Sequence, residues 1–101
     1  MKLLYHINKK KIIILIMSYS ISLYIPVFNA QKTIGMVIEA VKKQSLELNE
    51  IIVVNDGSTD DTSKIVKSFK NITLINLDKE KGISYCRNLA INKCKNNFIA
   101  S

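Results

Sequence analysis

Several residue types that often define a small protein's architecture are scarce in this sequence. Its 101 residues include one proline, three glycines, two cysteines, one histidine and no tryptophan. So little proline and glycine excludes collagen-like and linker-like chains. If Cys86 and Cys94 share one helix, they lie about 12 Å apart along its axis, which is beyond disulfide reach. Cysteine therefore indicates neither a disulfide framework nor a zinc site, and two free thiols are typical of a reducing, cytoplasmic compartment.

The length and composition are those of one folded domain or less. Hydrophobic residues make up 48% of the chain and charged residues 23%, which is typical of a globular protein with a core. The length excludes a two-domain enzyme.

Negative charge is also scarce, because 15 basic residues face 8 acidic ones. Arg87 is the only arginine, and no basic cluster with interleaved aromatic residues follows the N-terminal lysines, so we expect no nucleic-acid partner. A membrane span needs about 20 apolar residues, and serines interrupt the apolar run at 12–25. We interpret residues 1–20 as a basic and apolar extension, with peripheral contact to the inner face of a membrane. The basic residues of its first eleven positions are Lys2, Lys9, Lys10 and Lys11.

From Ile21 onward, strand-like and helix-like periods alternate along the chain. Apolar residues at helical spacing run through 34–41, and the wholly apolar run at 51–54 is typical of a strand buried on both faces of a parallel sheet. Residues 21–101 are therefore predicted to form an α/β, Rossmann-like parallel sheet in the order β-α-β-α-β-α-β. Strands are expected at 21–27, 51–54, 72–77 and 98–100, and helices at 31–44, after Ser58, and at 83–95.

Ligands of such sheets bind at the carboxyl ends of the strands, which here means residues 26–29 and 55–62. Neither GxGxxG nor GK[ST] is present, so the phosphate-binding loops that these patterns mark are excluded. Asp56 is an acceptor suited to a uracil N–H or a ribose hydroxyl, and Gly57 permits a sharp turn and a close approach of another group. In the alternative reading, Asp56 and Gly57 only make the turn, while Ser58, Asp60 and Asp61 cap the next helix and complement its dipole. Ser58 and Asp61 resemble a capping box.

Three segments in this order carry a resemblance to a known family: IPVFN at 25–29, EIIVVNDGSTDDT at 50–62 and KGISYCRN at 81–88. Together they resemble the family-2 glycosyltransferases, which have the A-type nucleotide-sugar-binding fold. The resemblance covers residues 21–101 and corresponds to the nucleotide-binding first half of that catalytic domain. It implies a strand order of 3-2-1-4, a UDP-sugar donor, a saccharide or lipid-linked acceptor, and a role in polysaccharide biosynthesis.

Carried over residue by residue, the resemblance implies a nucleotide-sugar site. Asp56 would pair with the uracil or ribose, with Gly57 beside it in the turn. Pro26 and Phe28 would line the base pocket, although Phe28 stands where tyrosine is common. Arg87 would face the nucleotide; in the alternative reading, it is an exposed helix residue paired with an acid.

The family's divalent-metal motif (Asp-x-Asp or a relative, for manganese or magnesium) follows the fourth strand, where this sequence ends. We therefore assign no catalytic and no metal-binding residue, and expect a truncated product or fragment that transfers no sugar by itself. The alternative is a non-catalytic remnant that binds a nucleotide or a protein partner. A receiver-type signalling domain would need an acidic pair after the first strand, and 26–29 has none.

Overall fold

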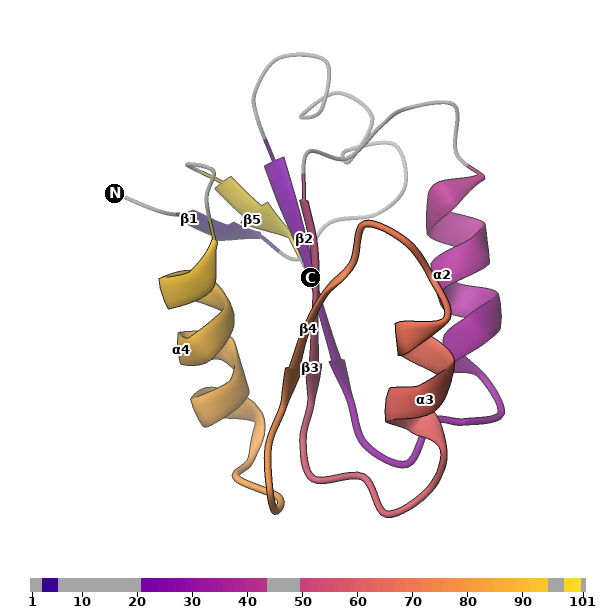
Figure 1. Cartoon of the computed structure of the whole chain (residues 1–101). Coiled ribbons are helices and arrows are strands. Elements are labelled where there is room, and N and C mark those ends of the chain that lie inside the picture. The colour runs from indigo at the N-terminus through magenta and orange to yellow at the C-terminus, as the bar shows by residue number, and fades with distance from the viewer. Residues whose placement is uncertain (1–2, 6–20, 44–49, 95–97, 101) are drawn as a thin grey trace.

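A parallel sheet of five strands runs through the centre of the molecule (Figure 1). The computed structural model describes residues 3–5, 21–43, 50–94 and 98–100. Every neighbouring pair of strands is parallel, and the order across the sheet is β1-β5-β2-β3-β4. The strands are β1 (Leu3–Tyr5), β2 (Ile21–Val27), β3 (Glu50–Asn55), β4 (Thr73–Asn76) and β5 (Phe98–Ala100).

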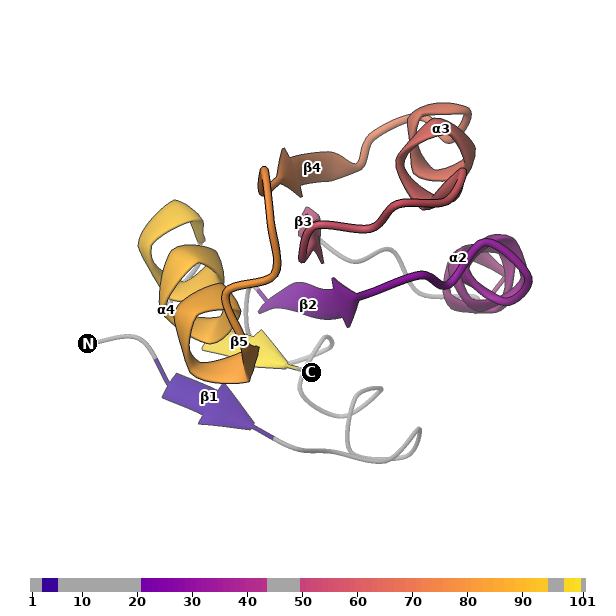
Figure 2. The same ribbon diagram turned by 90° about the horizontal axis from the view of Figure 1, so that it is seen from below.

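Three helices of the described chain cover the two faces of the sheet. Helices α2 (Ile34–Lys42) and α3 (Thr62–Lys67) lie side by side on one face, and α4 (Ile83–Lys93) lies on the other (Figure 2). None of the helices described is long and apolar enough to cross a membrane.

The predicted fold class is confirmed, and so is the order of the four predicted strands. Counted along the chain from β2, their order across the sheet is 3-2-1-4, with β3 as an interior strand between β2 and β4. Strand β1 extends the sheet beyond β5. No strand is predicted there from the sequence, because residues 3–5 fall within the predicted extension.

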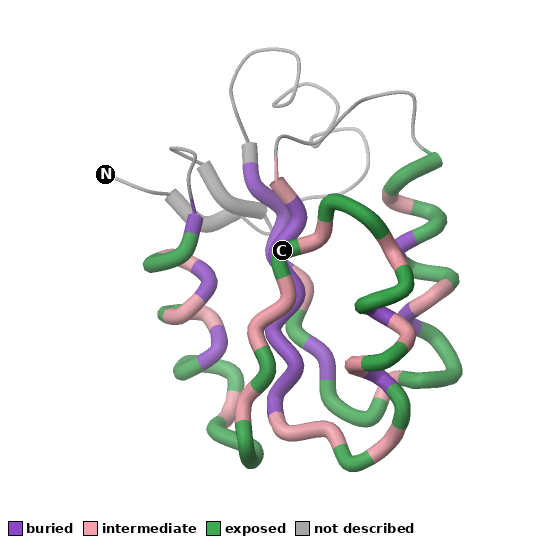
Figure 3. Tube along the Cα trace, in the orientation of Figure 1, coloured by how far each residue is buried: buried purple, intermediate pink, exposed green. Residues whose placement is uncertain are grey.

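Two hydrophobic cores form because successive side chains of a strand point to opposite faces of the sheet. Ile52 and Val54 pack with Tyr24 beneath α4, whereas Ile51 and Val53 pack beneath α2 and α3. Buried positions accordingly run along the whole of β3 after its first residue (Figure 3). The wholly apolar run at 51–54 is therefore buried on both faces, as its composition predicts.

The predicted capping box at the start of α3 is wrong. The helix begins at Thr62 with Asp61 at the N-cap position, and no side chain caps it there. Ser58 lies outside the helix, and its Oγ accepts a hydrogen bond from the backbone N–H of Asn29 at 2.8 Å. The hydroxyl oxygen that the local pattern assigns to the helix cap thus accepts a hydrogen bond from a residue 29 positions away.

Candidate functional site

The carboxyl ends of β2, β3 and β4 meet at one edge of the sheet, where three turns lie close together (Figure 1). The backbone N–H of Asp56 donates to the Val27 carbonyl at 2.9 Å, and that of Leu77 donates to the Asn55 carbonyl at 3.0 Å. The Asn55 side-chain amide also donates to Asn76 Oδ1 at 2.9 Å. These bonds fix the first residue of the 55–62 loop relative to both neighbouring strands.

Asp56 is buried at this edge, with 7% of its surface exposed. Its Oδ1 accepts from the backbone N–H of Lys81 at 2.7 Å, and its Oδ2 accepts from that of Gly82 at 3.1 Å. Gly82 is the N-cap residue of α4, so the negative charge lies at the positive end of that helix. An ionised carboxylate has about four acceptor sites, which leaves capacity for a ligand N–H.

Gly57 adopts a backbone conformation that only glycine takes without strain, with φ of 75°. A Cβ at this position would lie 2.4 Å from the Glu80 backbone N and 2.4 Å from the Lys79 carbonyl carbon. The close approach expected at Gly57 is therefore made by the chain's own 79–82 loop. Asp56 and Gly57 together hold that loop against the end of β3.

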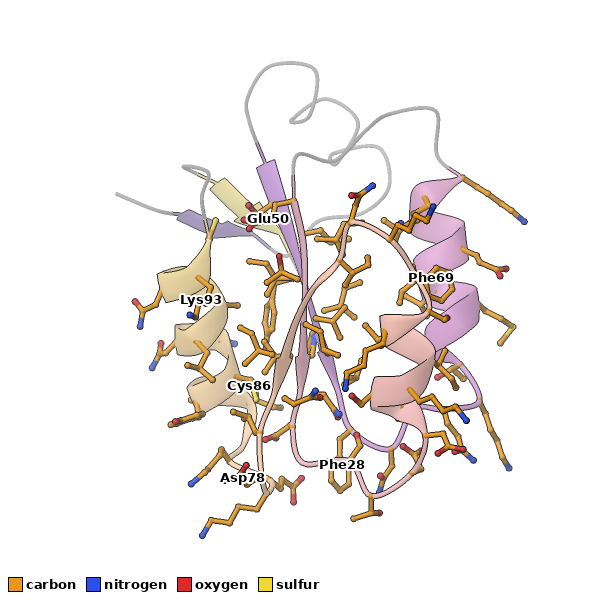
Figure 4. The ribbon with its side chains drawn as sticks, viewed as in Figure 1. Phe28, Glu50, Phe69, Asp78, Cys86 and Lys93 are labelled. Atoms are coloured by element: carbon orange, nitrogen blue, oxygen red, sulfur yellow. The ribbon has the colours of Figure 1, made fainter. Side chains whose placement is uncertain are left out.

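Pro26 and Phe28 lie at and beyond the end of β2. Pro26 pairs with Val54 of β3, while β5 pairs only with residues 21–23 of β2. The missing N–H of the proline therefore costs no sheet hydrogen bond on that side. Phe28 is 47% exposed, and its ring lies near the turn that follows β3 (Figure 4). An exposed aromatic ring at the end of the sheet that also holds a buried carboxylate is suited to stacking on a planar base.

Arg87 is half-buried on α4, next to Cys86 in sequence. Within the described part of the chain, no acidic side chain forms an ion pair with it. In the described residues, Arg87 is therefore neither fully exposed nor paired with an acid, in contrast to the alternative reading. The described residues therefore provide no acidic partner for the guanidinium donors of Arg87.

Beneath the site lie two buried side chains that the sequence does not associate with it, Tyr24 and Cys86. Burial raises the pKa of the Cys86 thiol to about 11, and the nearby Asp56 carboxylate raises it further in the same direction. Burial, and then Cys86, raise the pKa of Tyr24 to about 12. The Tyr24 hydroxyl has no hydrogen-bond partner among the described residues. Alternation along β2 places Tyr24 on the same face as Pro26, a signal that could have associated it with the site.

Side chains of the loop after β3 hydrogen bond to the loop after β2. Besides Ser58, the Asp60 carboxylate reaches across, where Oδ2 accepts from the backbone N–H of Gln31 at 3.2 Å. Its Oδ1 accepts from the Thr62 hydroxyl and from the Thr62 backbone N–H. The Thr62 side chain is the first cause of the lowered pKa of Asp60.

No group of three or more His, Cys, Asp or Glu side chains in the described ranges could hold a metal ion. The residues present there do not fit the divalent metal that the resemblance implies. The two cysteines are free and buried.

Comparison with known proteins gives one family for most of the chain. The family profile described as Glycosyl transferase family 2 matches residues 22–101. The O-antigen chain rhamnosyltransferase RfbN of Salmonella typhimurium is 36% identical over 74 residues, which are 72% of this chain and 24% of that protein. An Escherichia coli protein, the UDP-Glc:alpha-D-GlcNAc-diphosphoundecaprenol beta-1,3-glucosyltransferase WfaP, is 33% identical over 82 residues, or 79% of this chain and 33% of that protein.

A solved structure shows the same fold. The crystal structure of S. aureus TarS 1–349 in complex with UDP superposes with a TM-score of 0.71 at 27% identity, and the match covers 81% of this chain and 27% of that one. This chain spans between about a tenth and a third of the length of the curated relatives it matches.

Proposed function

The chain belongs to glycosyl transferase family 2, and on that premise we propose that it binds the nucleotide of a UDP-sugar whose sugar is transferred to an acceptor hydroxyl. The observation that carries the proposal is the buried Asp56 carboxylate, held at the carboxyl end of β3 with the exposed Phe28 ring nearby. This edge of a parallel α/β sheet is where such folds bind ligands. The UDP in the TarS structure supports the choice of nucleotide.

The donor and acceptor pattern of the site favours uracil. The carboxylate of Asp56 accepts hydrogen bonds only, so it pairs with the N3–H of uracil. The corresponding N3 of cytosine is itself an acceptor and offers the carboxylate no N–H at that position. The Phe28 ring, together with Pro26, supplies the apolar wall of the base pocket, and the guanidinium donors of Arg87 face the ribose or the phosphates.

The acceptor is proposed from the printed activities of the relatives. RfbN is an O-antigen chain rhamnosyltransferase and WfaP acts on a diphosphoundecaprenol-linked sugar, which supports a saccharide or lipid-linked acceptor. We propose a divalent metal only for the whole catalytic domain. The low cysteine content, with no disulfide between Cys86 and Cys94, supports a cytoplasmic location. Peripheral membrane contact through residues 1–20 is proposed from their basic and apolar composition.

Calorimetric titration of the chain with UDP, and with ADP as the control, tests the proposal. We expect UDP to bind and to raise the melting temperature in circular dichroism, since a ligand that binds only the folded state stabilises it. ADP should bind more weakly, because a purine presents no imide N–H to Asp56. A chain that melts cooperatively but binds neither nucleotide, or binds both equally, would contradict a uridine nucleotide site.

A further inference from the structure

Two loops that follow neighbouring strands are tied together by their own side chains. We call the tie the clasp, and define it as the hydrogen bonds that join residues 29–31 to residues 58–62. It includes three bonds from backbone N–H groups of the first loop: Asn29 to Ser58 Oγ at 2.8 Å, Ala30 to Thr62 Oγ1 at 2.9 Å and Gln31 to Asp60 Oδ2 at 3.2 Å.

The second loop returns bonds to the first, so that the clasp is reciprocal. The backbone N–H of Thr59 donates to Asn29 Oδ1 at 2.8 Å, and that of Asp61 donates to Gln31 Oε1 at 2.9 Å. Asn29 has a φ of 48°, a left-handed conformation that asparagine tolerates better than most residues. Asn29 in this conformation contributes both its backbone N–H and its side-chain oxygen to the clasp.

The clasp begins directly after the residues that the proposed site depends on. Asn29 directly follows Phe28 in the chain, and Ser58 directly follows Asp56 and Gly57. Phe28 and Asp56 directly follow the ends of β2 and β3, and the backbone N–H of Asp56 donates to the carbonyl of Val27, the residue before Phe28. The bonds of the clasp therefore restrict how far the Phe28 ring can move from the carboxylate.

One side chain of the clasp is wholly buried, which makes the tie more than a surface contact. Thr62 is 0% exposed, and its hydroxyl accepts from Ala30 while it donates to Asp60. Buried hydrogen bonds with both partners in place are rigid, since breaking one leaves an unsatisfied polar group.

We propose that Asn29 and Asp60 are positioning residues of the nucleotide site, which act through the clasp to set the separation between the Phe28 ring and the Asp56 carboxylate. The inference rests on the proposed function. A base that stacks on one strand's residue and hydrogen bonds to the next strand's residue gains affinity when the two are held at the right distance beforehand. Neither clasp residue needs to touch the nucleotide.

The test compares two substitutions of Asn29 that differ in whether the side chain can still accept the hydrogen bond from Thr59. Asn29→Gly keeps the left-handed φ but removes the side-chain acceptor of Thr59, whereas Asn29→Asp keeps an acceptor oxygen. The matched control is Asn71→Gly, because Asn71 is also an asparagine with positive φ, 61°, on an exposed turn before β4. UDP affinity is measured by calorimetry at a temperature at which circular dichroism shows every variant folded.

We expect Asn29→Gly to weaken UDP roughly 3- to 10-fold, the effect of about one neutral hydrogen bond. Asn29→Asp should restore most of the affinity, and Asn71→Gly should leave it unchanged. A double-mutant cycle separates positioning from stability: Phe28→Ala should cost a smaller factor in UDP affinity in the Asn29→Gly background than in the wild type.

Two outcomes would overturn the inference while leaving the proposed function intact. One is wild-type UDP affinity in folded Asn29→Gly, and the other is the same Phe28→Ala factor in both backgrounds. Failure of the folded wild-type chain to bind UDP at all would instead overturn the proposed function, and with it the positioning role that depends on a nucleotide.

Discussion

The Oδ2 atom of Asp56 accepts a hydrogen bond at 3.1 Å from the backbone N–H of Gly82, 26 residues further along the chain. With the second bond to Lys81, this contact places a negative charge at the start of α4, the helix that carries Arg87. The residue proposed to recognise the base thus also fixes the helix whose arginine is proposed to face the nucleotide. Any substitution of Asp56 therefore changes both recognition and local structure, and experiments have to separate the two.

The packing of the 79–82 loop against Gly57 predicts a difference between two glycines. Gly57→Ala puts a Cβ 2.4 Å from backbone atoms, whereas a Cβ at Gly82 meets nothing within 4 Å. Both have positive φ, which costs a non-glycine residue roughly 1–3 kcal/mol. Gly57→Ala should lose about 1–3 kcal/mol more than Gly82→Ala because of overpacking. Urea denaturation of both variants measures this, and equal losses would show that the loop moves aside freely.

The Tyr24 hydroxyl, which has no hydrogen-bond partner among the residues that the structure describes, should be removable without loss of stability. Tyr24→Phe should leave the free energy of unfolding unchanged or raise it by up to about 1 kcal/mol, because a buried hydroxyl without a partner carries a desolvation cost. Tyr85→Phe, which removes an exposed hydroxyl from α4, is the control. A clear loss of stability in Tyr24→Phe alone would mean that the hydroxyl has a partner in the folded protein.

Tyr24 also predicts the direction of an alkaline transition. Its pKa rises from 10.0 to about 12 in the folded chain, so the unfolded chain loses this proton first as the pH rises. Its contribution to stability is therefore fully present below pH 10 and is lost between about pH 10 and 12. Chemical denaturation across this range should show a shallower loss in Tyr24→Phe than in the wild type, and identical slopes would contradict the raised pKa.

The clasp predicts sensitivity to acid. The pKa of Asp60 is lowered below its usual 3.8, first by the Thr62 side chain, so its contribution to stability is present above that pH and is lost as the pH falls through the folded value. Asp60→Asn should flatten the acid limb of the stability profile. Asp61→Asn is the control, because the Asp61 carboxylate accepts none of the clasp bonds. Equal acid limbs in the wild type and Asp60→Asn would exclude this role.

The sheet could be predicted from the sequence because its signals are local. Residues 51–54 are consecutive β-branched, apolar residues between polar turns, and Val53 has no exposed surface in the structure. The predicted strand at 98–100 coincides with β5 for the same reason. Periods of two and 3.6 residues depend only on neighbours in the chain, and the family motifs fix their order.

The contacts of the turns could not be predicted, because their partners are distant in sequence. The local sequence predicts that Ser58 caps a helix. Its hydroxyl instead accepts a hydrogen bond from the backbone N–H of Asn29, which is 29 residues away. Asp56 was expected to face a ligand or make a turn, and no local rule places Lys81 and Gly82 beside it. Tyr24 and Cys86 are far apart in sequence, so their packing together beneath the site can be recognised only once the fold is known.

The most direct measurement of the central claim, that Asp56 recognises uracil, is the ratio of UDP to CDP affinities in the wild type and in Asp56→Asn. The amide keeps an oxygen for the 81–82 loop, but it can also donate to N3 of cytosine. A charge-assisted hydrogen bond contributes about 1.5–3 kcal/mol, so wild type should prefer UDP by roughly 10- to 100-fold. The account predicts that calorimetric titration of folded Asp56→Asn shows this preference lost or reversed. An unchanged preference for UDP would contradict it, and would leave Asp56 as the anchor of α4 alone.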